Sequence, residues 1–188
     1  MKKFQSAALA ASLTVATGLG LAAPGMASAT TRAASHRVRT VNAPRRAGVA
    51  ANEREVRAFL REVINEHHGD QAGQFLTRNM QWHGGTVGTV RGRTNVAGLF
   101  AGVVASLPNA HASIKDIFGQ GDQVVVRVVV RGTQKGALLG IPATGRNIHW
   151  DGVDIYRLQG GKISAIWAGD DWSAILFYTG TYKAPWIP

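Results

Sequence analysis

Two adjacent carboxylates near the end of the chain, Asp170 and Asp171, lie between two tryptophans, Trp167 and Trp172. An apolar, aromatic environment disfavours the ionised form of a carboxylic acid and raises its pKa toward neutrality. An acid with such a pKa can exchange protons with a substrate at physiological pH. These residue types in this order therefore indicate proton-transfer chemistry.

Strand alternation separates the two acids. Residues 163–169 are predicted to form a strand, and successive side chains of a strand leave opposite faces of a sheet. If the extended chain continues, Asp171 shares a face with Trp167, whereas Asp170 points the other way. We therefore predict Asp171 as the general acid or base. The alternative is that Asp171 caps a turn or helix that begins at Trp172, because aspartate is a preferred N-cap residue.

A third aspartate, Asp154, lies on the preceding predicted strand. Trp150 and Tyr156 occupy alternate positions on the same face, so all three side chains are predicted to line one cavity. There Asp154 could polarise a water molecule or orient a histidine. Alternatively, it pairs with an arginine on a neighbouring strand; the candidates are Arg127, Arg131 and Arg157.

His83 follows Trp82 at the end of a short apolar segment and precedes two glycines. A neutral imidazole at this position could form a hydrogen bond with a substrate carbonyl or tune the pKa of the aspartate, although a structural role is the alternative.

Two adjacent histidines, His67 and His68, lack partners at metal-ligand spacing, and no H-E-x-x-H motif occurs. We predict no metal site.

Three helices are expected before these strands. Apolar residues recur at helical spacing over residues 52–68, and Asn52 with Glu55 has the spacing of a capping box. A short helix is predicted at 71–76 and a polar turn at 77–79. A third helix is predicted at about 94–107, with Thr94 as its N-cap and Pro108 just beyond its end.

The period of the apolar residues then changes from 3.6 to 2. Strands are predicted at 112–118, 123–133, 148–158 and 163–169, after a short strand at 80–83. The last two strands are joined at Gln159-Gly160-Gly161, a tight hairpin signal. Helices followed by long antiparallel strands indicate an α+β fold in which three N-terminal helices pack on a curved, mainly antiparallel sheet.

With this order of elements, the chain resembles the SnoaL-like polyketide cyclase family of the nuclear-transport-factor-two-like superfamily. The resemblance spans residues 52–177. It is carried by FLREVINEHHGD (59–70), WHGG (82–85), RGTQKGALLGIPATGR (131–146), WDGVDIYRLQGGKI (150–163), and Trp167 followed four positions later by Asp171.

The resemblance implies a cone-shaped α+β barrel whose mouth admits a small, mostly apolar molecule. It also implies aldol-type ring closure by an aspartate near the end of the domain, with no metal and no cofactor, although non-catalytic binding members of the superfamily are common. His83 matches a histidine common in the family. Ala165 and Gly169 stand where family members often carry glutamate, which favours a binding role. Because fold alone does not select the chemistry, both roles are retained.

We therefore expect a cone that binds a small apolar carbonyl compound. Asp171 is the predicted acid or base, and His83 and Asp154 are predicted to polarise the substrate or position water. The predicted cavity lining is Trp150, Trp167, Phe118 and Tyr156. The rival expectations are a non-catalytic binding protein and a module that forms a homodimer through its sheet.

The ends of the chain are predicted to lie outside this domain. Residues 1–29 have a basic start, an apolar run and a small-x-small sequence at Ala27-Ser28-Ala29, which together are typical of a signal peptide. A membrane anchor is the alternative for this run. Residues 30–51 carry five arginines and no acid, so we predict a disordered basic linker. The remaining residues, 52–188, form one domain, and the mature protein is predicted to be secreted or periplasmic.

The net charge of +10 belongs mostly to the ends of the chain. The predicted domain carries 14 Lys and Arg against 11 Asp and Glu. Nucleic-acid binding needs a basic face interleaved with aromatic residues, and the domain sequence shows none, so we expect no specific nucleic-acid partner. The basic linker could be attracted weakly to an anionic cell envelope.

Cysteine is absent, so no disulfide can form and stability must come from the apolar core.

Overall fold

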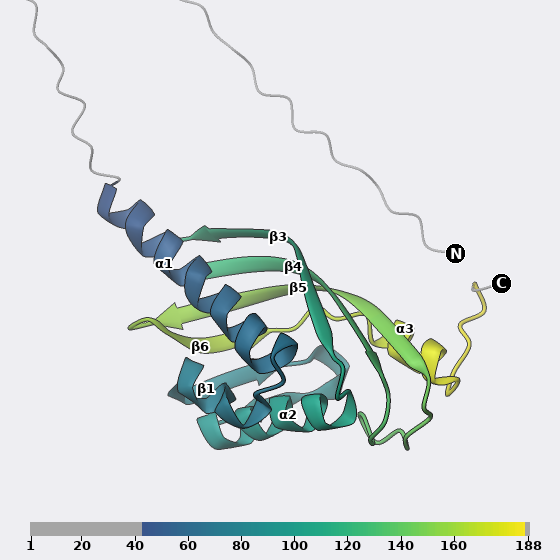
Figure 1. Cartoon of the computed structure of the whole chain (residues 1–188). Coiled ribbons are helices and arrows are strands. Elements are labelled where there is room, and N and C mark those ends of the chain that lie inside the picture. Colours follow the sequence, from purple (N-terminus) through teal and green to yellow (C-terminus); the bar gives the residue numbers. More distant parts are fainter. Residues whose placement is uncertain (1–42, 187–188) are drawn as a thin grey trace, which may run out of the picture. The chain divides into compact units, whose positions relative to one another are not determined.

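A computed structural model describes residues 43–186 of the 188-residue chain. A curved, open six-stranded sheet wraps around a layer of helices, in the strand order β2-β1-β6-β5-β4-β3 (Figure 1). The strands are β1 (Leu76–His83), β2 (Thr89–Arg91), β3 (His111–Gln120), β4 (Gln123–Thr133), β5 (Asn147–Gln159) and β6 (Lys162–Trp167). The helical segments are α1 (Ala43–Phe59), a π-helical turn η1 (Leu60–Asn65), the 3₁₀ segments η2 (Gly69–Phe75) and η3 (Gly85–Val87), α2 (Arg93–Ser106) and α3 (Trp172–Thr179). The predicted α+β class and curved sheet are confirmed.

The sheet is antiparallel except where β1 runs parallel to β6. The β4 and β5 strands stay in continuous register from Gln123 opposite Arg157 to Thr133 opposite Asn147. The predicted hairpin forms between β5 and β6, and Gly160 and Gly161 both adopt positive φ, as a two-residue turn of this kind requires. The continuous pairing of β4 with β5 keeps the alternation of β5 regular, so every second side chain of β5 faces the helices.

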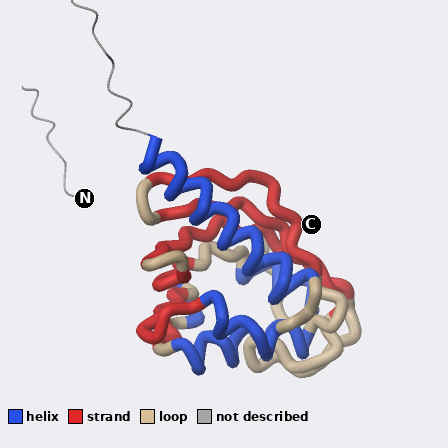
Figure 2. Tube along the Cα trace, turned by 60° about the vertical axis from the view of Figure 1, so that its left-hand side comes forward, coloured by secondary structure: helices blue, strands red, loops and turns tan. Residues whose placement is uncertain are grey.

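Phe59 joins the helical layer to the concave face of the sheet. Its fully buried ring makes edge-to-face contacts with Phe75 of η2, Phe100 of α2 and Tyr156 of β5. Figure 2 shows α1 and α2 on the inner side of the curved sheet. The core therefore lies between the helices and the inner faces of β4 and β5, and one end of it stays open as a cavity.

The first helix begins earlier than the capping-box pattern predicts. The structure starts α1 at Ala43, so residues 43–51 of the predicted disordered linker are helical. Asn52 does not cap the helix; its Nδ2 donates a hydrogen bond to the carbonyl oxygen of Gly121, 3.2 Å away. Val49 packs so closely on Gly119 that a methyl group there would lie 2.7 Å from Val49 Cγ1. These contacts with the β3–β4 turn extend the helix beyond its predicted start.

Three other boundaries differ from the prediction. The predicted polar turn at 77–79 belongs to β1, because Leu76 already pairs with Ile163 of β6. The short strand β2 has no clear signal in the sequence and forms by pairing with β1. The N-cap of α2 is Gly92, at φ 87°, rather than Thr94.

The predicted signal peptide and residues 30–42 of the predicted linker lie outside the described residues. Within residues 43–186, no helix has the length and hydropathy needed to span a membrane.

Candidate functional site

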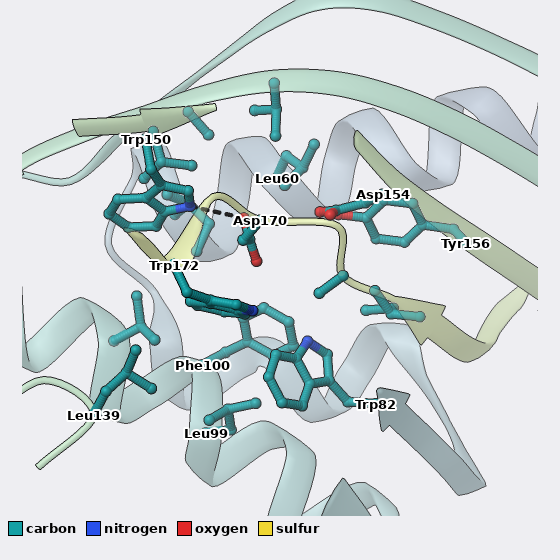
Figure 3. A pocket seen from close by; sticks show the side chains of 17 residues that line it. Leu60, Trp82, Leu99, Phe100, Leu139, Trp150, Asp154, Tyr156, Asp170 and Trp172 are labelled. Atoms are coloured by element: carbon teal, nitrogen blue, oxygen red, sulfur yellow. Dashed lines mark hydrogen bonds between the residues drawn. The ribbon is translucent and has the colours of Figure 1, made fainter. Parts of the chain in front are cut away.

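An apolar cavity of about 90 Å³ lies between the helical layer and the inner face of the sheet. Side chains from η1, α2, α3 and every strand except β2 line it, and most are aliphatic or aromatic (Figure 3). The aromatic residues of the lining are Trp82, Phe100, Trp150, Tyr156 and Trp172. Among the described residues, the acidic ones that line it are Asp154 and Asp170. An apolar cavity with a few convergent polar groups is the usual form of a small-molecule site.

Asp154 is held on the inner face of β5. Trp150, Gly152, Asp154 and Tyr156 are all buried, whereas the residues between them are more exposed, so the predicted alternation of this strand is confirmed. Asp154 as a whole residue is 8% exposed. One of its oxygens accepts a hydrogen bond from the Gly169 amide at 3.1 Å, and the other accepts one from the Tyr156 hydroxyl at 3.3 Å.

Asp154 forms no ion pair with any arginine of residues 43–186. Arg127 pairs with Asp116 at 2.7 Å, and Arg157 approaches Asp122 at 3.8 Å. The structure therefore does not support the alternative prediction of an arginine partner for Asp154.

Asp170 enters the same cavity from the segment after β6. The backbone of Asp170 forms an isolated bridge with Gly152. Its Oδ1 accepts a hydrogen bond from the indole nitrogen of Trp150 at 2.7 Å. Gly152 makes this approach feasible, because a Cβ atom there would lie 2.8 Å from Oδ1 of Asp170 and 3.6 Å from Oδ1 of Asp154. Both carboxylates thus come within 4 Å of one point beside the Gly152 backbone.

The environment raises the pKa of both acids. Burial, reinforced by the nearby charge of Asp170, raises the pKa of Asp154 to about 8, against the opposing hydrogen bonds from Gly169 and Tyr156. Burial also raises the pKa of Asp170 to about 6, against the opposing hydrogen bond from Trp150. The pKa of Tyr156 is raised well above its usual value, first by burial and then by the neighbouring aspartates.

Two acids with separated pKa values can carry out different roles. At neutral pH Asp154 is mainly protonated and can donate a hydrogen bond, whereas Asp170 is mainly ionised and can accept a proton. In Figure 3 both carboxyl groups point into the space bounded by Trp82, Trp172 and Tyr156. This arrangement can support general acid and general base catalysis on one small ligand.

Asp171, the predicted catalytic acid, lies outside the cavity and is the N-cap of α3. Its Oδ1 accepts hydrogen bonds from the amides of Ser173 at 3.0 Å and Ala174 at 3.2 Å. The side chain is exposed, and it borders a shallow hollow with Arg127 and Asp151 on the other side of the sheet. The alternative prediction of a helix cap is therefore confirmed, and the predicted position of Asp171 in the cavity is wrong.

Trp167 and His83 also lie outside the cavity lining. Their rings stack 5.4 Å apart, and the Arg157 guanidinium lies 5.0 Å from the centre of the Trp167 ring. Nδ1 of His83 is 3.2 Å from the hydroxyl of Thr89. His83 therefore does not meet Asp154, and the structure favours the structural role that was the alternative for this histidine.

Phe118 is 60% exposed and does not contribute to the lining. Of the four predicted lining residues, Trp150 and Tyr156 are in place, whereas Trp167 and Phe118 are not. The sequence prediction missed Asp170, Trp82 and Trp172 as members of the site. Alternation did place Asp170 with Ile166 and Ala168, both of which line the cavity, but the face of Trp167 was taken as the inner one.

In the described part of the chain, no cluster of three metal-ligand side chains lies in this cavity. Within residues 43–186, three ligand-type side chains gather only at Glu62, Glu66 and His68, which are partly or fully exposed. Arg61 already pairs with both glutamates, at 2.6 Å and 3.3 Å. This pairing accounts for the cluster without a metal ion.

Sequence comparison identifies the family to which this fold and cavity belong. The profile of the SnoaL-like polyketide cyclases matches residues 54–176, which is most of the described domain. The chain belongs to the SnoaL-like polyketide cyclase family. No curated protein matches its sequence.

Several solved structures share the SnoaL-like fold of this chain. IdmH from Streptomyces antibioticus is 26% identical, with a TM-score of 0.57 over 69% of this chain and 98% of IdmH. A SnoaL-like polyketide cyclase from Agrobacterium tumefaciens is 19% identical, with a TM-score of 0.55 over 66% of this chain and 94% of that one. An LEH-like epoxide hydrolase from M. tuberculosis is 13% identical, with a TM-score of 0.58 over 71% of this chain and 92% of that one. Because cyclases and an epoxide hydrolase share the fold, the function of this SnoaL-like domain must be argued from its own cavity.

Proposed function

We propose that this SnoaL-like domain binds a small, largely apolar carbonyl compound and transfers protons next to its carbonyl group, giving aldol-type cyclisation or isomerisation. The observation that carries the proposal is the pair Asp154 and Asp170, which share one otherwise apolar cavity and have separated pKa values. Membership of the cyclase family supports the same reaction class.

In the proposed reaction Asp170 is the base. Its Oδ1 is held by Trp150, which leaves Oδ2 free to take a proton from the carbon next to the substrate carbonyl. Protonated Asp154 donates a hydrogen bond to the carbonyl oxygen as negative charge develops there. The enolate then attacks a second carbonyl carbon or is reprotonated at another carbon, and the proton held by Asp170 returns to the product.

The cavity limits the size of the substrate. Its volume of about 90 Å³ is of the same order as an apolar cavity of about 150 Å³ that takes up benzene in an engineered protein. A single ring or a short branched ketone suits this space. Leu139, which is exposed and borders the cavity, belongs to the loop between β4 and β5, and this loop would have to move for a larger substrate.

A panel of cyclic ketones and short diketones tests the proposal. We expect proton exchange or isomerisation that falls at least 100-fold in Asp170→Asn, while ligand binding is retained. Asp151→Asn is the matched control, because Asp151 is an exposed aspartate that does not line the cavity. Equal turnover in wild type and Asp170→Asn would contradict the assigned base.

A non-catalytic binding protein is the second candidate function. The observation that favours it is the hydrogen bond from Trp150 to Asp170. This bond fixes the Asp170 carboxylate in the cavity, where it can hold a polar group of a ligand without transferring a proton. Binding of the ketones without turnover in any variant would establish this candidate and exclude the catalytic one.

Export of the protein is also part of the proposal and rests on residues 1–29. The test is mass spectrometry of the chain recovered outside the cytoplasm, for which we expect an N-terminus near Thr30. Recovery of the intact chain from the cytoplasm alone would contradict export.

A further inference from the structure

The cavity combines buried negative charge with aromatic walls. Its acidic residues in the described part of the chain are Asp154 and Asp170. Three of its aromatic side chains are tryptophans: Trp82, Trp150 and Trp172. Trp82 and Trp172 meet edge to face with their centres 6.2 Å apart. The indole faces are electron-rich, and an indole is the aromatic ring that attracts a cation most strongly.

The two carboxylates have no cationic partner among the described residues. Neither aspartate takes part in an ion pair, and the nearby arginines of the sheet, Arg127 and Arg157, pair with Asp116 and Asp122. No lysine, arginine or histidine of residues 43–186 lines the cavity. A carboxylate removed from water without a counter-ion is costly, so the cavity favours a ligand that supplies positive charge.

The space next to Asp170 suits a compact organic cation better than an inorganic ion. A metal ion needs several oxygen or nitrogen ligands, whereas the remaining walls offer mainly carbon. A methylated ammonium ion presents apolar methyl groups that carry the positive charge, so it can contact indole faces and a carboxylate together. In Figure 3 the free oxygen of Asp170 points toward Trp82 and Trp172, where such an ion would sit.

We propose that the cavity also binds a small tertiary or quaternary ammonium ion, held by Asp170 and by the rings of Trp82 and Trp172. This inference uses the same cavity as the proposed function but does not depend on catalysis. The ammonium ion and the carbonyl compound would exclude each other from the site.

Choline and its neutral carbon isostere, 3,3-dimethylbutan-1-ol, are matched probes, because they differ in the charged centre and share their shape. We expect calorimetry of the full chain at pH 8 to show one choline site, with choline bound at least tenfold more tightly than the alcohol. Equal binding of the two compounds, or binding of neither, would overturn the proposal.

Variants locate the site. Asp170→Asn keeps the shape of the side chain and should weaken choline binding at least tenfold, whereas Asp151→Asn should leave it unchanged. Trp172→Leu should weaken choline more than the alcohol, because it removes the aromatic face and keeps an apolar wall. Circular dichroism of each variant checks that it is folded, and unchanged choline binding in folded Asp170→Asn would refute the assignment.

The pH dependence gives an independent readout. The titratable groups that face Asp170 in the cavity are Asp154 and Tyr156, both on β5. On its other side Asp170 borders the outer hollow, where the charged groups are Arg127, Asp151 and Asp171. The pKa of Asp170 is about 6 and that of Asp154 is about 8, so both acids lose negative charge as the pH falls from 8 to 5. Choline binding should therefore weaken over this range, whereas binding of the alcohol should stay nearly unchanged. A choline affinity that does not vary over this range would count against a role for the carboxylate.

The choline and ketone experiments distinguish the two proposals. Choline binding with no ketone turnover would refute catalysis alone, and turnover with no choline binding would refute the ammonium site alone.

Discussion

The substitution Gly152→Ala tests the geometry of the carboxylate pair most sharply. The new Cβ atom would lie 2.8 Å from Oδ1 of Asp170 and 3.4 Å from Cγ1 of Val128. The first distance is too short for two such atoms, so the Asp170 carboxylate must move. Its 2.7 Å hydrogen bond from Trp150 would then be lost or lengthened.

The expected effect on stability follows from these contacts. A hydrogen bond to a charged group contributes about 1.5–3 kcal/mol, and overpacking costs about 1–3 kcal/mol. Because the carboxylate can relax toward the cavity, we expect Gly152→Ala to lower the free energy of unfolding by about 3 kcal/mol in urea denaturation. Displacement of the base by about 1 Å should also reduce turnover about 100-fold.

Gly98→Ala is the matched control. Gly98 lies within α2, and a Cβ atom there would meet nothing within 4 Å. This substitution should stabilise the helix by up to about 1 kcal/mol. If Gly152→Ala leaves both stability and the fluorescence of the tryptophans unchanged, the close approach of Asp170 to Gly152 is refuted.

The other predictions concern Asp171, Asp154 and Phe118. Asp171→Ala removes the N-cap of α3 and should lower the free energy of unfolding by about 1 kcal/mol in urea denaturation. Ketone turnover should stay unchanged. A loss of turnover as large as that of Asp170→Asn would instead identify Asp171 as the base. The folded-state pKa of Asp154 is raised to about 8, so its contribution to stability is fully present below the unfolded-state pKa of about 4 and is lost as the pH rises through 8. Asp154→Asn should therefore lose less stability than wild type between pH 5 and 9, and equal losses in the two proteins would show that the Asp154 pKa is not raised. Phe118 is exposed and pairs with Val125 on the outer face of the sheet, so we propose a homodimer through this face. Light scattering should show a dimer that the substitution Phe118→Asp converts to a monomer. A wild-type protein that stays monomeric at high concentration would exclude this dimer.

The sequence predicted the fold well because its periodic signals are strong. The β-branched run at 123–133 and the double glycine at 160–161 each determine a strand or a turn locally. The early start of α1 was missed because it depends on contacts of Val49 and Asn52 with the distant β3–β4 turn. Likewise β2 forms only through its pairing with β1.

The site was predicted in part for a related reason. Alternation sorts the side chains of a strand into two sets, but it does not say which set faces the core. On β5, Trp150, Asp154 and Tyr156 were assigned to the correct face. On β6 the large ring of Trp167 suggested the inner face, whereas the structure stacks it with His83 and Arg157 on the outside. That choice, together with the match of Asp171 to the late aspartate of the family, led to the prediction of Asp171 in place of Asp170.

The proposed function rests on Asp154 and Asp170 forming an acid pair with raised pKa values in one cavity. Carbon-13 NMR titration of the aspartate carboxyl groups, assigned with Asp154→Asn and Asp170→Asn, measures it without a known substrate. We expect the pair to titrate with apparent pKa values of about 6 and about 8, and each substitution to change the titration of the remaining acid. Two independent titrations near pH 4, the usual value for an exposed aspartate, would contradict the account.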